Sequence, residues 1–180
     1  MQSPFEGQLV RLRAREPGDE PMLYRWFNDP EVTEHLTVRY PLSHAQERAF
    51  IESAAEISYN HASFGVETIT EGRLIGGVGL EKTSPESRRA TLGIALGDKQ
   101  FWNGGYGTDT MRVICRFGFE TMNLHRIDLE VYASNARARR VYEKVGFKQE
   151  GVLREAMYKY GRYEDIVQMG LLEGELRLRD

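Results

Sequence analysis

The stretch "QFWNGGYGTDT", residues 100–110, carries three glycines within four positions, behind a tryptophan and ahead of a threonine–aspartate pair. A helical pattern with apolar residues on one face follows at 108–122. A glycine-rich turn that leads into a helix places free backbone N–H groups at the positive end of the helix dipole. The stretch therefore predicts an anion-binding turn at a helix N-terminus, a place where a phosphate group binds.

Three interpretations compete for these glycines. A P-loop requires a lysine followed by serine or threonine after its last glycine, but Thr108 and Asp109 follow Gly107. A dinucleotide-binding fingerprint requires a third glycine where Thr110 stands, and it prefers the first strand–helix junction of a chain. A tight turn without any ligand is the third interpretation, and the glycines alone do not decide against it.

Composition limits the class of protein. The chain has 180 residues, of which 41% are hydrophobic and 28% charged, so we expect one globular domain over 1–180. The net charge of -3 provides no basic surface for nucleic acid or an anionic membrane. The sequence has no apolar run of membrane-spanning length, its first residues do not resemble a signal peptide, and Cys115 is its single cysteine. We expect a soluble, cytoplasmic protein with neither a nucleic-acid nor a membrane partner.

Hydrophobic periodicity predicts seven strands and four helices. In chain order we expect a strand at 7–14, helices at 19–27 and 43–55, strands at 63–70, 73–83 and 89–97, a helix at 108–122, a strand at 126–133, a helix at 134–146, and a hairpin that ends the chain. Asn28-Asp29-Pro30 is expected to end the first helix, and Ala45, Ala49, Phe50 and Ala54 to form the apolar side of the second. This order indicates a mixed α/β fold (α+β), not a regular doubly wound sheet.

The run from about 90 to 153 resembles the GNAT superfamily of acyl-CoA-dependent N-acetyltransferases. The family's cofactor loop, Q/R-x-x-G-x-G/A, is matched by Gly105-Tyr106-Gly107, and its later motif by Asn135, Ala138 and "YEKVGF" at 142–147. The N-terminal "RWFNDPEV" resembles the branch of ribosomal-protein N-terminal acetyltransferases, with polyamine acetyltransferases nearby. Trp102 stands where the loop normally has Gln or Arg, and we expect its side chain to be the least constrained part of the loop.

The resemblance implies a central, mostly antiparallel sheet of about seven strands flanked by about four helices, an acceptor side at about 19–55 and an acetyl-CoA-binding core at about 89–147. The residues it assigns to the cofactor are Ile94, Leu96, Trp102, Asn103, Gly104, Gly105, Tyr106, Gly107, Thr108, Asn135 and Arg140. Thr108 and Asn135 could equally be helix N-caps, and Arg140 could belong to a solvated cationic face with Arg137, Arg139 and Lys144. The four histidines lack metal-ligand spacing, so no metal is expected.

The implied chemistry is attack of an amine on a thioester. An alkyl amine has a pKa of about 10.4, so a carboxylate must accept its proton, and the leaving thiolate needs a proton donor. By its place in the motif Tyr142 is the expected donor, and Glu130, twelve residues earlier, is the expected base. The alternatives are that Tyr142 fills an apolar helix stripe and that Glu130 is a solvated strand residue. Cys115 lies on an apolar helix face and is expected to be an inert core thiol.

The predicted function is transfer of acetyl to a primary amine, of a small molecule or a protein N-terminus, by direct attack in a ternary complex. The alternative is a non-catalytic acyl-CoA-sensing module that acts through a partner. The first two helices and the residues just before them carry acidic residues that either attract a cationic acceptor or serve as helix caps and surface charge: Glu16, Asp19, Glu20, Asp29, Glu31 and Glu34. The C-terminal hairpin leaves a homodimer open.

Overall fold

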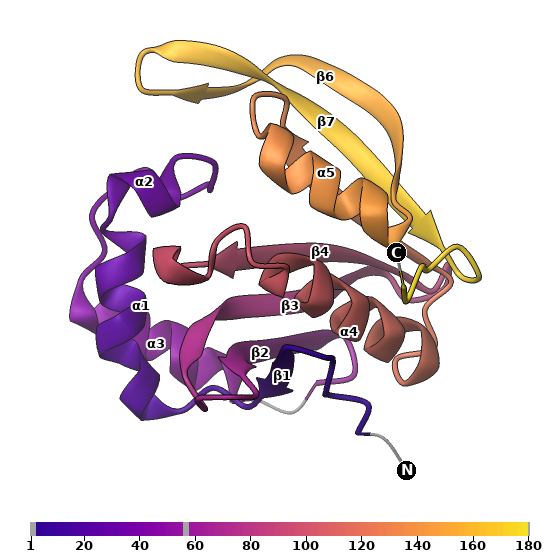
Figure 1. The fold of residues 1–180 in the computed structure, drawn as a ribbon. Helices are drawn as coiled ribbons and strands as arrows, with labels where there is room; N and C mark the ends of the chain where they lie inside the picture. Colours follow the sequence, from indigo (N-terminus) through magenta and orange to yellow (C-terminus); the bar gives the residue numbers. More distant parts are fainter. Residues whose placement is uncertain (1–2, 56–57, 180) are drawn as a thin grey trace.

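Seven strands form one sheet in the order β1-β2-β3-β4-β5-β7-β6 in the computed structural model, which describes residues 3–55 and 58–179 (Figure 1). The strands are β1 Val10–Arg13, β2 His61–Thr68, β3 Leu74–Ser84, β4 Arg89–Leu96, β5 Arg126–Tyr132, β6 Lys148–Lys159 and β7 Arg162–Leu172. Neighbouring strands pair antiparallel except β4 and β5, which run parallel. The predicted mixed, mostly antiparallel sheet is confirmed.

The helices lie in two groups (Figure 1). The helices are α1 Glu20–Phe27, α2 Pro30–Thr33, α3 His44–Ala54, α4 Tyr106–Glu120 and α5 Ala136–Val145, with 3-10 turns η1 Pro17–Asp19 and η2 Lys99–Phe101. Helices α4 and α5 cover one face of the sheet, whereas α1, α2 and α3 gather at the end where β4 finishes. No helix in the described part of the chain is long and apolar enough to cross a membrane.

The sequence predicted four helices, and the short helix α2 is the addition. Asn28-Asp29-Pro30 does end α1, but the same residues also start α2: the Asp29 carboxylate accepts the N–H of Glu31 as an N-cap, and Pro30 occupies the first turn. A proline fits there because the first N–H groups of a helix have no intrahelical acceptor. One motif therefore serves both as a stop and as a start.

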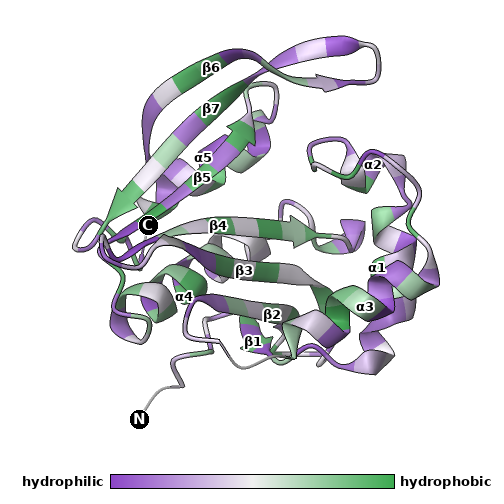
Figure 2. Cartoon of the chain, turned by 180° about the vertical axis from the view of Figure 1, so that it is seen from behind, coloured by the Kyte–Doolittle hydropathy of each residue, from purple (hydrophilic) through white to green (hydrophobic). Residues whose placement is uncertain are grey.

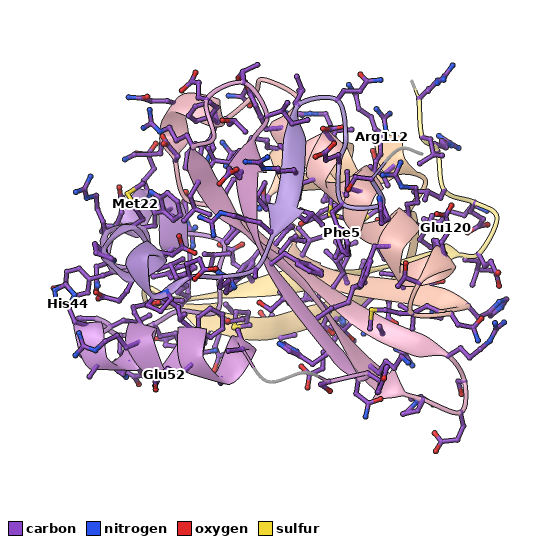
Figure 3. The ribbon with its side chains drawn as sticks, turned by 90° about the horizontal axis from the view of Figure 1, so that it is seen from below. Phe5, Met22, His44, Glu52, Arg112 and Glu120 are labelled. Atoms are coloured by element: carbon purple, nitrogen blue, oxygen red, sulfur yellow. The ribbon has the colours of Figure 1, made fainter. Side chains whose placement is uncertain are left out.

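The predicted apolar side of α3 is wrong. Ala45, Ala49 and Phe50 are exposed, whereas Glu47 and Ile51 are buried. Alanines bury little area, so packing of Ile51 beside Leu23 and Trp26 of α1 decides the orientation of the helix. Figure 3 shows the labelled side chain of Glu52 on the outer side of this helix.

The main core lies between the sheet and the helices α4 and α5. Met111, Ile114 and Cys115 of α4 are fully buried against strand residues such as Ile75 and Ile127. Figure 2 shows the matching hydrophobic segments along the central strands β3, β4 and β5. A second, smaller cluster of Leu23, Trp26, Val32, Ile51 and Leu74 lies under α1. The smaller cluster belongs to the α1–α3 end of the molecule, which the sequence analysis expects to be the acceptor side.

Asp109 ties the N-terminal segment to α4. Its carboxylate, 8% exposed, accepts the backbone N–H groups of Gln8, Leu9 and Val10 at 3.1, 2.7 and 3.0 Å. Beside it, the ring of Phe5 packs at 5.4 Å from that of Phe117, and Figure 3 shows Phe5 at this junction. The aspartate after the glycine loop therefore holds the first strand in place.

We expect Asp109→Ala to lower the free energy of unfolding by about 2–4 kcal/mol, because hydrogen bonds to a charged group contribute about 1.5–3 kcal/mol each and the buried N–H of Val10 loses its acceptor. Asp109→Asn keeps one acceptor oxygen and should lose less. Urea unfolding of the two variants measures the difference. A loss below about 0.5 kcal/mol, the size of an ordinary surface substitution, would contradict this role.

Candidate active site

The strands β4 and β5 pair over only three residues and then separate. Arg89 to Thr91 lie opposite Arg126 to Asp128, and no pairing continues beyond Thr91 and Asp128. From Leu92 to Leu96, the edge of β4 that faces β5 therefore has no strand paired with it. Figures 1 and 2 show the two strands diverging toward the end of the sheet that α1, α2 and the η2 turn occupy.

The register shows which backbone groups face this opening. The N–H of Gly97 bonds to the carbonyl of Ile75 on β3, and the N–H of Arg126 on β5 bonds to the carbonyl of Arg88. Because bonding direction alternates along a strand, the N–H and C=O groups of Ile94 and Leu96 point toward β5. Ile94 and Leu96 are the two strand residues that the sequence assigned to the cofactor. The N–H and C=O of Ile94 and the N–H of Leu96 can pair with an extended, amide-containing chain, whereas the C=O of Leu96 accepts the indole N–H of Trp102.

The glycine loop leaves the N-terminus of α4 open. Gly105 is the N-cap in the left-handed conformation at φ 87°, where glycine carries no steric penalty, and Asn103 also has a positive φ of 63°. Among the described residues no side chain caps this helix, so the first-turn N–H groups of Gly107 and Thr108 remain free for an anion. Thr108 lies inside the first turn, and the interpretation of this residue as the N-cap is wrong.

Trp102 is fixed on three sides, so the expectation that its side chain is unconstrained is wrong. Its indole N–H donates to the carbonyl of Leu96 at 2.8 Å. Its ring packs against the acceptor-side cluster that contains Trp26. From the opposite side of the opening, the guanidinium of Arg137 on α5 lies 4.1 Å from the ring centroid. Trp102 thus joins the loop, the edge of β4, the acceptor side and α5.

Helix α5 begins at the same opening. The side chain of Asn135 accepts the N–H of Ala138 at 3.1 Å, so it is the N-cap of this helix, as one of the two interpretations proposed. Arg140 is exposed on α5, as expected of a solvated face. Arg139, another residue of this cationic face, donates to the side chain of Gln149 at 3.4 Å. Sequence spacing did not single out Arg137, because only the fold brings it to Trp102.

Tyr142 is buried on the helix face of β5. It is 8% exposed, and its ring packs 6.0 Å from that of Phe147. Burial raises the pKa of Tyr142 to about 12, so its hydroxyl keeps its proton at neutral pH. Among the described residues the hydroxyl has no hydrogen-bond partner. The side chain both fills the apolar stripe and retains a proton that it can donate.

Glu130 lies on the other face of β5. Its neighbours Leu129 and Val131 are buried, whereas Glu130 is exposed. Glu130 lines a cavity of about 320 Å³ together with Arg89, Thr91, Leu92, Arg126, Asp128, Leu129, Glu150, Gln168 and Met169. The amide of Gln168 donates to its carboxylate at 3.3 Å, and no cation pairs with Glu130 among the described residues.

The remaining carboxylates of this cavity are engaged. Asp128 accepts two bonds from Arg89 at 2.7 and 2.8 Å, and Glu150 pairs with Arg126. Hydrogen bonding by Arg126 holds the pKa of Glu150 below its ordinary value. Glu130 is therefore the carboxylate of the cavity that is available to an incoming amine.

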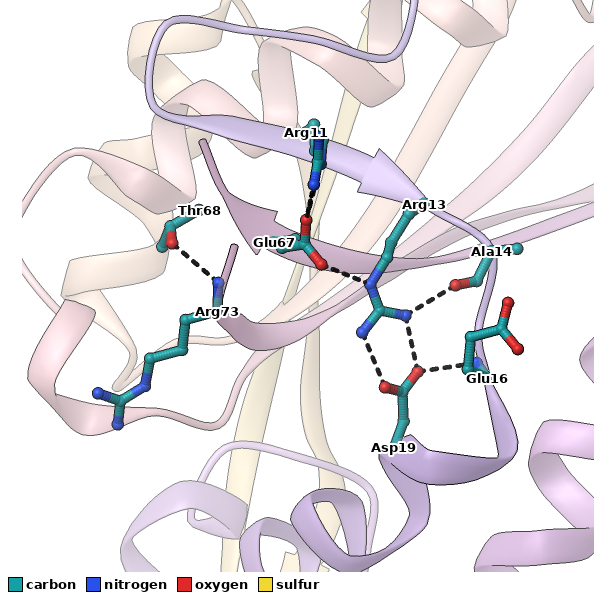
Figure 4. A network of polar contacts seen from close by, with 8 residues as sticks. All are labelled: Arg11, Arg13, Ala14, Glu16, Asp19, Glu67, Thr68 and Arg73. Atoms are coloured by element: carbon teal, nitrogen blue, oxygen red, sulfur yellow. Dashed lines mark hydrogen bonds and ion pairs between the residues drawn. The ribbon is translucent and has the colours of Figure 1, made fainter. Parts of the chain in front are cut away.

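Most of the acidic residues before and within α1 and α2 have structural partners. Figure 4 shows Arg13 between Asp19, at 2.7 and 2.9 Å, and Glu67, at 2.8 Å. Burial acts to raise the pKa of Asp19, but the bonds from Arg13 outweigh it and lower the pKa. Lys99 pairs with Asp29 at 2.9 Å and with Glu31 at 2.7 Å. These contacts confirm the interpretation as structural charge.

Among the described residues, neither the thiol of Cys115 nor a cluster of metal-binding side chains forms part of this site. Cys115 is fully buried, and burial raises the pKa of its thiol far above its ordinary value, which confirms a core thiol. In the described ranges 3–55 and 58–179, no three His, Cys, Asp or Glu side chains lie together as a metal-binding group would.

Comparison with known proteins agrees with this geometry. The family model of the acetyltransferase (GNAT) domain matches residues 10–148. The uncharacterized N-acetyltransferase p20 of Bacillus licheniformis is 27% identical over 170 residues, which cover 93% of this chain and 95% of that protein.

Solved structures share the fold. A spermidine N-acetyltransferase of Vibrio cholerae, in complex with CoA and spermine, superposes with a TM-score of 0.83 at 26% identity, covering 92% of this chain and 96% of that one. A GNAT-family acetyltransferase of Bacillus anthracis reaches a TM-score of 0.82 at 21% identity, covering 93% and 97%. The family model matches most of the sequence, and the solved structures share the fold in which β4 and β5 separate beside the N-terminus of α4. The chain therefore belongs to the GNAT family of N-acetyltransferases.

Proposed function

We propose that this protein transfers the acetyl group of acetyl-CoA to a primary amine by direct attack in a ternary complex. One observation carries the proposal: where β4 and β5 part, a protonated Tyr142 lies on one face of β5 and an unpaired Glu130 on the other. We further propose that the whole chain is one acetyltransferase domain, with the acceptor side at 19–55 and the cofactor side at 89–147.

The cofactor side fits a CoA molecule. The free first-turn amides of α4 would hold its pyrophosphate, with Asn103 to Thr108 forming the loop around it. The backbone of Ile94 and Leu96 would pair with the pantetheine arm, and Asn135 and Arg140 would line the edge at α5. When bound, acetyl-CoA supplies the thioester carbonyl that the amine attacks.

The two ionisable residues divide the proton transfers. Glu130 accepts a proton from the acceptor ammonium, directly or through a water, and so produces the neutral amine that can attack. Tyr142 donates its phenolic proton to the departing thiolate sulfur of CoA. A free thiol has a pKa of about 8.5. Cys115 takes no part, because a fully buried thiol can form no acyl-enzyme with an external donor.

The relatives support an amine acceptor. The Vibrio cholerae neighbour is named a spermidine acetyltransferase and contains spermine in its structure, so this fold accepts a primary amine. Release of free thiol from acetyl-CoA, measured across polyamines, aminoglycosides, amino acids and peptides, tests the activity. Tight CoA binding without thiol release on any amine would favour the alternative of a non-catalytic sensing module.

We expect Tyr142→Phe to lower kcat about 10²–10⁴-fold at unchanged folding, because phenylalanine fills the same space without the proton donor. Because the pKa of Tyr142 is about 12, the wild-type rate should show no loss between pH 7 and 9 from this group. The pH–rate profile of both proteins checks this. An equal rate in the variant would remove Tyr142 from the mechanism.

We expect Glu130→Gln to slow the reaction about 10²–10⁴-fold at pH 7. The loss should shrink as the pH rises toward the acceptor's own pKa, since the free amine then forms without a base. Glu143→Gln, on the exposed side of α5, is the matched control and should retain full activity. A loss that stays constant from pH 7 to 10 would show that Glu130 does not act as the base.

We expect Arg137→Met to raise the KM for acetyl-CoA about 2–5-fold with little change in kcat. The cation over the Trp102 ring contributes about 0.5–1 kcal/mol at an exposed site, and the ring in turn holds the loop. Arg48→Met on the exposed side of α3 is the control. Steady-state kinetics that show an unchanged KM would mean that the contact does not order the cofactor loop.

A further inference from the structure

A second cavity, of about 160 Å³, lies between α1, α2 and the tip of the β6–β7 hairpin. Its lining residues are Phe27, Asn28, Pro30, Thr33, Val38, Arg39, Tyr40, Pro41 and Tyr160. Arg39 is the only charged residue in this lining. Its walls are aromatic rings, prolines and one guanidinium, so its chemistry differs from that of the acidic cavity around Glu130.

Tyr132 lies between Glu130 and the segment that carries the lining residues Val38 to Pro41 of the second cavity. It stands two residues after Glu130 on the same face of β5, about 6.7 Å further along the strand. Its hydroxyl donates to the carbonyl of Leu36 at 3.5 Å, and its ring meets that of His35 edge-on at 5.8 Å. Burial raises the pKa of Tyr132, while the positive charge of Arg39 acts to lower it. The second cavity therefore lies beyond Tyr132 as seen from Glu130.

A lysine of the β6–β7 hairpin binds the chain segment that forms one wall of the second cavity. Lys159 is 7% exposed, and its ammonium group donates to the carbonyls of Thr33, Glu34 and Leu36. Burial lowers the pKa of Lys159, and the charge of Arg39 lowers it further. These bonds fix the segment between α2 and Arg39 before any ligand arrives, which reduces the entropy cost of binding.

The positive charge of Arg39 has no carboxylate partner among the described residues, and its guanidinium contacts only the sulfur of Met157, at 2.8 Å. On the β6–β7 hairpin, Glu164 is occupied, because it pairs with Arg162 at 2.8 Å and accepts the hydroxyl of Ser134. An anionic ligand would therefore meet an unneutralised cation here.

We infer that this cavity is the subsite for the far part of the acceptor, and that it selects the α-amine of a peptide with an acidic side chain near its N-terminus over a polyamine. The inference rests on the proposed function. A polyamine is cationic along its length, and Arg39 repels it. An extended peptide advances about 3.3 Å per residue and can place its amine at Glu130 and a carboxylate at Arg39. A free amino acid cannot, since one carbon separates its two groups.

The test uses amidated pentapeptides that differ only in carrying glutamate, glutamine or lysine at the second, third or fourth position, with spermidine as a further acceptor. Thiol release from acetyl-CoA is measured for wild type, Arg39→Gln and Arg39→Glu. We expect the best glutamate peptide to exceed its lysine counterpart about fivefold in kcat/KM, because glutamate gains a charge-assisted bond with the exposed Arg39 and lysine is repelled by it. Arg39→Glu should reverse the preference.

Arg48→Glu, an exposed charge reversal on α3, is the matched control and should leave the preference unchanged. Equal rates for the three peptides, a preference for spermidine, or a preference that survives Arg39→Glu would each overturn the inference while the enzyme activity stands. If no acceptor releases thiol, the proposed function falls, and calorimetric titration of the same peptides in the presence of CoA decides the inference. Tighter binding of the glutamate peptide, lost in Arg39→Glu, would support it, and equal affinities would overturn it.

Discussion

The site depends on the early end of the pairing between β4 and β5. Had the parallel ladder continued past Thr91 and Asp128, the backbone groups of Ile94 and Leu96 would be satisfied inside the sheet. A strand edge with unpaired N–H and C=O groups is normally a liability, since other chains can add to it. Here the edge lies between α4 and α5, which cover one face of the sheet, and α1 to α3, which gather at its end (Figure 1).

The two residues that we propose as proton donor and base lie in different environments. Tyr142 belongs to the dry core beside α4, and burial raises its pKa to about 12. Glu130 belongs to an open polar cavity, where an amide from Gln168 is its hydrogen-bond partner. A side chain that keeps its proton and one that can accept a proton thus lie on opposite faces of one strand. Alternation along β5 turns Glu130 away from the core, while helix α5, packed on the other face of the sheet, carries Tyr142.

Trp102 makes the two sides of the site dependent on each other. The ring rests on the acceptor-side cluster, bonds to the end of β4 and receives Arg137 from α5. A shift of the cofactor loop must therefore move a residue that packs beside α1. On the opposite side of the opening, Lys159 holds the segment after α2 against the hairpin. The acceptor side is in this way attached to both halves of the sheet.

Local patterns in the sequence determined much of this protein. The glycine loop before α4, the cap at Asn135, the left-handed Gly146 at the end of α5 and the alternation around Glu130 depend on neighbours within a few residues, and each could be predicted. The family motifs located the loop and Tyr142. The face of α3 could not be predicted, because its apolar residues are small and tertiary packing decided which side was buried. Two contacts join residues that are far apart in the sequence: Arg137 with Trp102, 35 positions apart, and Lys159 with Thr33, 126 positions apart. The divergence of β4 and β5 depends on where the hydrogen bonds between the two strands end. No local period encodes such contacts, and only the tertiary structure decided them.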